Sequence, residues 1–184
     1  MKTAVEGILY PVDACSKIGN LESSSNQEPR PFVYVPHAAW TNCKDQLDTI
    51  FSQLANLKPT RIFVLAPLHK GPINKEDIQV VYTPLDGILR GSDWQIKLDL
   101  PANIKELVQT SDDICSEEHS LEIIAPYLYK LFSSSPVTYL LAAGQGSIFS
   151  KIVKILQKDF PDSLFLISNN SSTSCAHLWL EAFK

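Results

Sequence analysis

The sequence has no basic run, although the chain is long enough to carry one. Its 16 Lys and Arg residues are outnumbered by 20 Asp and Glu residues, which gives the 184-residue chain a formal net charge of −4. Proteins that neutralise nucleic-acid phosphates gather Lys and Arg on one patch or stripe. We therefore expect no nucleic-acid partner.

Long apolar segments are also absent. No stretch approaches the roughly 20 apolar residues that a membrane-spanning helix needs. At the N-terminus, Glu6 falls inside what would be the apolar region of a signal peptide. Both absences predict a soluble, cytoplasmic protein with no membrane partner.

Cysteine pairs and the common catalytic signatures are missing as well. The four cysteines lie far apart without CxxC spacing, which argues against a zinc ribbon or a disulfide framework, so we expect buried or free thiols: Cys15, Cys43, Cys115 and Cys175. The sequence contains no HExxH, P-loop, GxGxxG or GxSxG motif. The sequence therefore gives no support for assigning the chain to the common zinc proteases, nucleotide-binding proteins or esterases.

Hydrophobic residues make up 45% of the chain, which is enough to build the core of one domain. We predict a single domain over residues 1–184. Residues 16–30 are rich in Ser, Asn, Glu and Pro, and this composition predicts a surface loop or a disordered connection. The residues before that loop should form a small arm.

Apolar runs alternate along the chain with segments of helical periodicity. The runs predict strands at 32–35, 61–66, 78–82, 137–143 and 163–168, and the periodicity predicts helices at 46–57, 104–108, 117–132, 148–156 and 176–183. Residues 83–87 should form a turn, and Pro126 should kink or split the helix around it. This alternation is typical of an α/β fold with a mostly parallel sheet covered by helices on both faces.

The histidines provide the candidate chemistry. His37 and His69 follow two predicted strands, His119 opens a predicted helix, and His177 follows the last strand. Ligands of parallel α/β sheets bind at the carboxyl ends of the strands, and neutral imidazole is a common ligand of zinc, copper and iron. We expect His37 and His69 to leave neighbouring parallel strands and to converge. For each histidine, a purely structural role as a hydrogen-bonded residue or a helix cap stays open.

Several segments, in their order and spacing, resemble the Memo family. They are 4–11 (AVEGILYP), 35–40 (VPHAAW), 63–72 (FVLAPLHKGP), 82–86 (YTPLD), 117–122 (EEHSLE), 126–128 (PYL) and the strand that ends at Gly144. The resemblance implies a fold similar to the class III extradiol dioxygenases, a three-layer α/β/α sandwich whose pocket holds non-haem iron in those enzymes. The resemblance also implies a metal-binding pocket, which in the Memo family is formed by histidines and a cysteine. His37 and His69 match its first two histidine positions, and His119 matches a third nearby.

The sequence departs from the family pattern at this pocket. Asn170 and Thr173 stand where the family usually has an Asp and, three residues later, a His. Neither replacement can act as a general base at neutral pH. Lys70 replaces a second adjacent histidine and adds a positive charge at the pocket rim. The family's cysteine ligand comes from a later segment that this sequence lacks, and Cys175 or His177 could take its place.

Two functional hypotheses follow. The first is a divergent, non-catalytic Memo-like protein whose remnant metal or ligand pocket binds a small anion, a peptide or a protein partner, or serves as a scaffold. The alternative is a metal-dependent redox or dioxygenase-like enzyme, with iron, copper or zinc held by His37, His69 and a third ligand. Because the family's last third is missing, we also expect an uncovered apolar surface and a homodimer.

Overall fold

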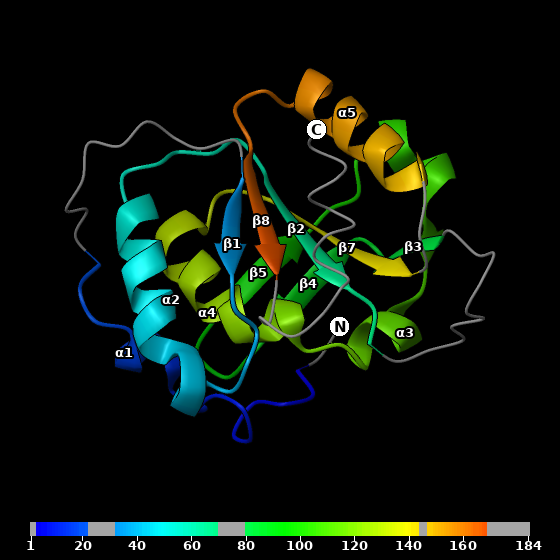
Figure 1. Cartoon of the computed structure of the whole chain (residues 1–184). Coiled ribbons are helices and arrows are strands. Elements are labelled where there is room, and N and C mark those ends of the chain that lie inside the picture. The colour runs from blue at the N-terminus through cyan, green and yellow to red at the C-terminus, as the bar shows by residue number, and fades with distance from the viewer. Residues whose placement is uncertain (1–2, 22–31, 70–79, 144–146, 169–184) are drawn as a thin grey trace.

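The computed structural model describes residues 3–21, 32–69, 80–143 and 147–168. Its elements in chain order are α1 (Ala14–Lys17), β1 (Val33–Val35), α2 (Trp40–Leu54), β2 (Ile62–Pro67), β3 (Val80–Thr83), β4 (Gly87–Arg90), β5 (Gln95–Leu98), the 3-10 helix η1 (Ala102–Leu107), β6 (Gln109–Thr110), α3 (Asp112–Ser116), α4 (Ser120–Phe132), β7 (Val137–Ala143), α5 (Ser147–Asp159) and β8 (Leu164–Ser168). Figure 1 shows their arrangement.

One sheet runs through the centre of the molecule, in the order β1-β8-β2-β7-β3-β6, and β4 and β5 join it beside β7. The central pairs β1–β8, β8–β2 and β2–β7 are parallel, whereas β3 runs antiparallel to β7 and β4 antiparallel to β5. The long apolar strands β2, β7 and β8 are completely buried, as strands covered on both faces should be. The predicted mostly parallel sheet is confirmed.

Helices cover both faces of this sheet. Along β2, Val64 packs into the core that contains the buried residues of α2 and α4, while Phe63 and Leu65 point into the core formed with η1 and α5. This alternation follows from the two-residue period of a strand. Figure 1 shows α2 and α4 on one side and α5 on the other. The expected three-layer α/β/α sandwich is therefore confirmed.

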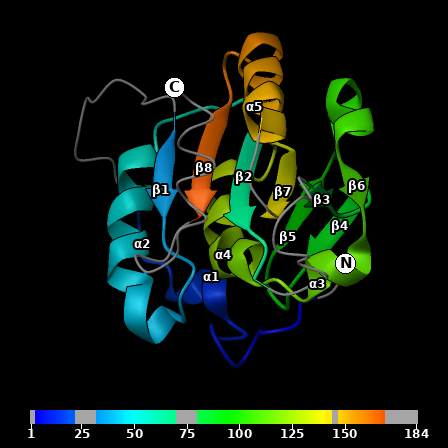
Figure 2. The same cartoon turned by 45° about the vertical axis from the view of Figure 1, so that its right-hand side comes forward.

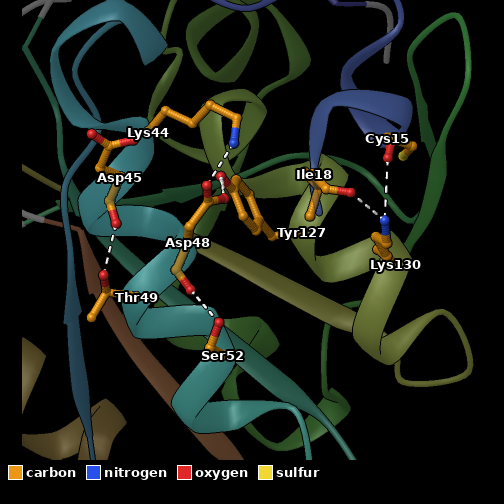
Figure 3. Close-up of polar contacts among 9 residues, drawn as sticks. All are labelled: Cys15, Ile18, Lys44, Asp45, Asp48, Thr49, Ser52, Tyr127 and Lys130. Carbon is orange, nitrogen blue, oxygen red and sulfur yellow. Dashed lines mark hydrogen bonds and ion pairs between the residues drawn. The ribbon is translucent and has the colours of Figure 1, made fainter. Parts of the chain in front are cut away.

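Helices α2 and α4 are joined by an aromatic stack and by a polar contact, and Figure 3 shows the polar contact. The rings of Phe51 and Tyr127 stack with their centroids 4.7 Å apart. The Tyr127 hydroxyl donates to Asp48 Oδ1 at 2.6 Å, and Lys44 Nζ pairs with the other oxygen of Asp48 at 2.6 Å. Burial raises the pKa of Tyr127 far above its ordinary value, so the hydroxyl keeps its proton and remains a donor.

The segment 3–18, which we call the N-terminal arm, packs against α4. The buried carboxylate of Glu122 accepts the backbone N–H of Ala4 at 2.9 and 3.0 Å and that of Val5 at 3.2 Å. At the other end of the arm, Lys130 Nζ donates to the carbonyl of Ile18 (Figure 3). The predicted arm is thus tied to α4, the helix that begins within the EEHSLE motif.

Replacing Glu122 with Ala should lower the free energy of unfolding by about 2–3 kcal/mol, because hydrogen bonds to a charged group are worth about 1.5–3 kcal/mol each. Burial raises the pKa of the Glu122 carboxyl although the N–H groups of Ala4 and Val5 lower it, so the net loss should be smaller than the sum of the bonds. Urea denaturation measures the loss, and amide exchange at Ala4 and Val5 should accelerate. The exposed Glu106→Ala variant is the control. Equal stability of the Glu122→Ala and Glu106→Ala variants would contradict the role of Glu122 in holding the N-terminal arm.

Several sequence predictions differ from the structure. The helix predicted at 46–57 begins earlier, at Trp40, and the one predicted at 104–108 is the 3-10 helix η1. Pro126 lies inside an uninterrupted α4, so the helix is not split in two, whereas the predicted bend at Pro126 stays a prediction. The turn at 83–87 leads into the β4–β5 hairpin, which the sequence did not predict. The helix predicted at 176–183 lies outside the described residues.

No helix among the described parts of the chain is both long and apolar enough to cross a bilayer. The three cysteines within those parts, Cys15, Cys43 and Cys115, are free thiols, as expected. Cys175 lies outside them.

Candidate functional site

The carboxyl ends of β1, β8 and β2 lie at the same edge of the sheet because the three strands are parallel (Figure 2). Val35, the last residue of β1, is paired with Ser168, the last residue of β8, and His37 follows two residues later. Beyond the end of β2, the backbone N–H of Leu68 still donates to Ala142 of β7 at 2.9 Å. The main chain is therefore held in place up to the residue before His69.

His37 and His69 do not leave neighbouring strands, so that part of the sequence prediction is wrong. Strand β8 lies between β1 and β2 and pairs with both. Sequence order does not reveal where the last strand inserts, and this is why the arrangement was missed. The two rings nevertheless lie close together, with centroids 5.1 Å apart, because both follow strand ends at the same edge.

His119 brings a third ring to the same place. It immediately precedes α4, and its ring centroid lies 6.1 Å from that of His37 and 6.3 Å from that of His69. We call these three residues the histidine cluster. Their functional role stays a prediction. The other candidate residues lie outside the described residues: Lys70, Asn170, Thr173, Cys175 and His177.

His37 is the buried member of the histidine cluster. Its side chain has no exposed surface, and its Nδ1 lies 2.7 Å from the hydroxyl of Ser168. Burial, and to a smaller extent the neighbouring His69 and His119, lower the pKa of His37 to about 4. At neutral pH this imidazole is therefore uncharged and keeps a lone pair on one ring nitrogen.

His69 is the more accessible member and has a very different partner. Its side chain is 31% exposed, whereas the carboxylate of Glu118 beside it is 1% exposed. Glu118 Oε1 accepts the backbone N–H of His69, and Oε2 lies 2.9 Å from the ring Nδ1. The hydrogen bond to Glu118 raises the pKa of His69, while burial acts in the opposite direction. The same edge of the sheet thus holds one histidine with a lowered pKa, His37, and one with a raised pKa, His69.

Sequence reasoning missed Glu118 and Ser168. Glu118 lies within the EEHSLE motif directly before His119, and an acid next to a candidate ligand was the available signal. The sequence signal for Ser168 was weaker, because Ser168 is only the last residue of a buried strand. Carboxylate and hydroxyl groups that bond the second nitrogen of a functional histidine fix the orientation of its ring.

A family model described as Memo-like protein matches residues 2–172. The chain belongs to the Memo family. Memo proteins of vertebrates are its relatives: the protein named MEMO1 from Mus musculus and that from Homo sapiens are each 26% identical over 161 residues, covering 79% of this chain and 52% of the relative. The chain thus spans about half the length of the curated relatives that it matches.

Because the chain belongs to the Memo family, the question arises whether the histidine cluster could hold a metal ion. His37 and His69 each engage a protein group through Nδ1, which is the arrangement typical of metal-bound histidines. Their rings are close enough to act as a pair of ligands. However, no group of three or more His, Cys, Asp or Glu side chains that could hold a metal ion occurs within 3–21, 32–69, 80–143 and 147–168. These parts of the Memo fold therefore supply two fitting ligands and not a complete site.

Proposed function

We propose that this Memo protein is a binding protein that holds a small ligand at the histidine cluster and catalyses no reaction there. The observation that carries the proposal is the convergence of three imidazole rings, with centroids 5.1 to 6.3 Å apart, at the carboxyl edge of a parallel sheet. Binding sites of open α/β folds form at this edge.

The chemistry of the cluster supports binding more than catalysis. The neutral His37 can offer a lone pair, and the partly exposed His69 can meet a ligand from solvent. A proton-transfer step would need a base with a pKa near the operating pH. Asn170 and Thr173, at the positions where the family usually has an acid and a base, cannot supply one, which leaves the Glu118–His69 pair as the base that a catalytic role would use.

A metal-dependent enzyme is the second candidate, and the Glu118–His69 pair favours it. A carboxylate that bonds Nδ1 of a histidine raises the basicity of Nε2 and so strengthens a metal bond. A divalent metal such as iron, copper or zinc, held by His37 and His69, would supply Lewis-acid chemistry. His119 or a residue outside the described parts would have to complete the ligand set.

Ligand binding at the histidine cluster can be tested with the full 15N-labelled chain. Titration with Zn2+, and separately with inorganic phosphate, should shift the imidazole signals of His37, His69 and His119 together for one of the two probes. His37→Ala should abolish the shift, and Gln95→Ala, an exposed change on β5, should retain it. No shift with either probe would contradict the binding function.

Catalysis is tested on the same protein loaded with iron(II). With catechol as substrate, dioxygen consumption should be no faster than with iron(II) alone. Turnover that is lost in His37→Ala but kept in Gln95→Ala would instead establish the second candidate. The homodimer, the peptide or protein partner and the cytoplasmic location remain predictions from the sequence.

A further inference from the structure

Helix α5, which lies on the opposite side of the sheet from α2 and α4 (Figure 1), carries three lysines on its outer face. Lys151, Lys154 and Lys158 are exposed, whereas the other face of the helix is buried in the core that it shares with η1. The three lysines follow each other at steps of three and four residues, which places them in one row. At about 1.5 Å per residue the row is about 10 Å long. We call it the lysine stripe.

The lysine stripe has no partner within the part of the chain that the structure describes. No ion pair or hydrogen bond joins any of its three ammonium groups to residues 3–21, 32–69, 80–143 or 147–168. The lysines of the other α-helices each have a partner there: Lys17 pairs with Asp13, Lys44 pairs with Asp48, and Lys130 donates to the carbonyl of Ile18. Helix α5 is thus different from the other helices.

The stripe also destabilises the helix that carries it. Like charges three or four residues apart repel each other on a helix surface. The single acid of α5, Asp159, stands at its last position and accepts a hydrogen bond from Asn103 Nδ2 of η1 at 2.5 Å. The whole chain has 20 Asp and Glu residues against 16 Lys and Arg residues, so its composition does not explain this row of lysines. An arrangement that lowers stability without serving the fold is typical of a functional surface.

We propose that the lysine stripe is a docking surface for an acidic segment of a partner protein, whose carboxylates lie along the stripe and remove the repulsion between its lysines. Positive patches that meet negative ones in this way give an interface its specificity. The proposal goes beyond the proposed function, because the stripe contains no residue of the histidine cluster.

The charge of the whole protein favours a short acidic segment over an extended polyanion. The formal net charge is −4, so outside the stripe the chain carries an excess of acids. A membrane or a nucleic acid would meet that negative surface together with the stripe. A short segment meets the stripe alone, because at physiological ionic strength exposed charges act over only about 8 Å.

The probe is an oligoglutamate peptide, titrated into the full 15N-labelled chain at neutral pH and about 0.1 M NaCl, where charges act over about 10 Å. The amide signals of α5 should shift, and the shifts should disappear at about 1 M NaCl. An oligoglutamine peptide of the same length should shift none of them. Unchanged α5 signals with oligoglutamate would overturn the proposal.

Replacement of all three stripe lysines with glutamine should weaken the binding of oligoglutamate about 10-fold, because three ion pairs are lost and each is worth a few-fold in affinity. The matched control replaces three exposed lysines outside α5 and removes the same charge: Lys17→Gln, Lys58→Gln and Lys97→Gln. This control should bind oligoglutamate like the wild type. Equal weakening in both variants would show that net charge alone attracts the peptide, and would overturn the docking surface.

Lys154→Glu separates docking from folding. The new carboxylate stands three residues after Lys151 and four before Lys158, where opposite charges stabilise a helix. Lys154→Glu should therefore unfold at a higher urea concentration than the wild type, although its α5 signals no longer respond to oligoglutamate. Retained binding of oligoglutamate in this variant would overturn the proposal.

The other anionic partners are tested with phosphatidylserine vesicles and with single-stranded DNA, under the same conditions as the peptide. Neither should change the α5 signals at about 0.1 M NaCl, because the acidic remainder of the surface repels both. A response to vesicles or DNA that disappears when the three stripe lysines are replaced would overturn the assignment of the stripe to a protein partner.

Discussion

Acidification from pH 6.5 to about 4 is expected to destabilise the protein by about 3 kcal/mol through His37 alone. The unfolded chain takes up a proton on this residue near its ordinary pKa of 6.5, whereas burial in the folded protein lowers the pKa to about 4. Between these values the unfolded state binds more protons than the folded state. The stability contributed by neutral His37 is therefore present above pH 6.5 and is lost as the pH falls through this window.

The measurement compares urea denaturation of the wild type and of His37→Gln across that pH window. The variant should be less stable at neutral pH, because a fully buried imidazole and its contact with Ser168 are lost. Its stability should nevertheless fall less steeply with acid, and the difference in slope isolates His37 from the carboxylates that titrate in the same range. Identical slopes for the two proteins would show that His37 does not resist protonation.

Phe51→Ala should give the largest single loss of stability, about 3–5 kcal/mol. Phe51 is completely buried on the inner face of α2 and stacks on Tyr127 of α4, with centroids 4.7 Å apart. Removing the ring leaves a cavity between the two helices that form one layer of the sandwich, and the stack itself is lost as well. Equilibrium unfolding in urea, followed by circular dichroism, measures the change.

Gln46→Ala on the exposed side of the same helix is the control for Phe51→Ala. Exposed substitutions of this kind usually change stability by about 0.5 kcal/mol or less. If Phe51→Ala cost no more than this control, the packing of α2 against α4 would differ from the structure described above.

The layers of the fold could be predicted from the sequence because their signals are local. Apolar runs mark the completely buried strands β2, β7 and β8, and three- and four-residue spacing marks α4 and α5. The β4–β5 hairpin escaped prediction because each strand has only four residues and much of β4 is exposed. Such short strands depend on pairing with neighbours, which local patterns do not encode.

The candidate site was predictable only in part, for a related reason. Family motifs identified His37, His69 and His119, and their rings do lie together. The partners that set their chemistry, Ser168 and Glu118, depend on strand order and side-chain direction. Neither property can be read from one sequence, because both arise only when segments more than 40 residues apart come into contact.

The position of β8 also determines when the histidine cluster can form during synthesis. Strand β8, the last one described, inserts between β1 and β2, which are made much earlier. A growing chain that has not yet reached residue 164 holds His37 and His69 on strands that have no partner between them. Pairing between strands that are distant in the sequence slows folding, because the entropic cost of closing the intervening loop comes before the stabilising contacts form. A nascent chain should therefore capture no ligand at the histidine cluster until β8 has left the ribosome and taken its place between β1 and β2.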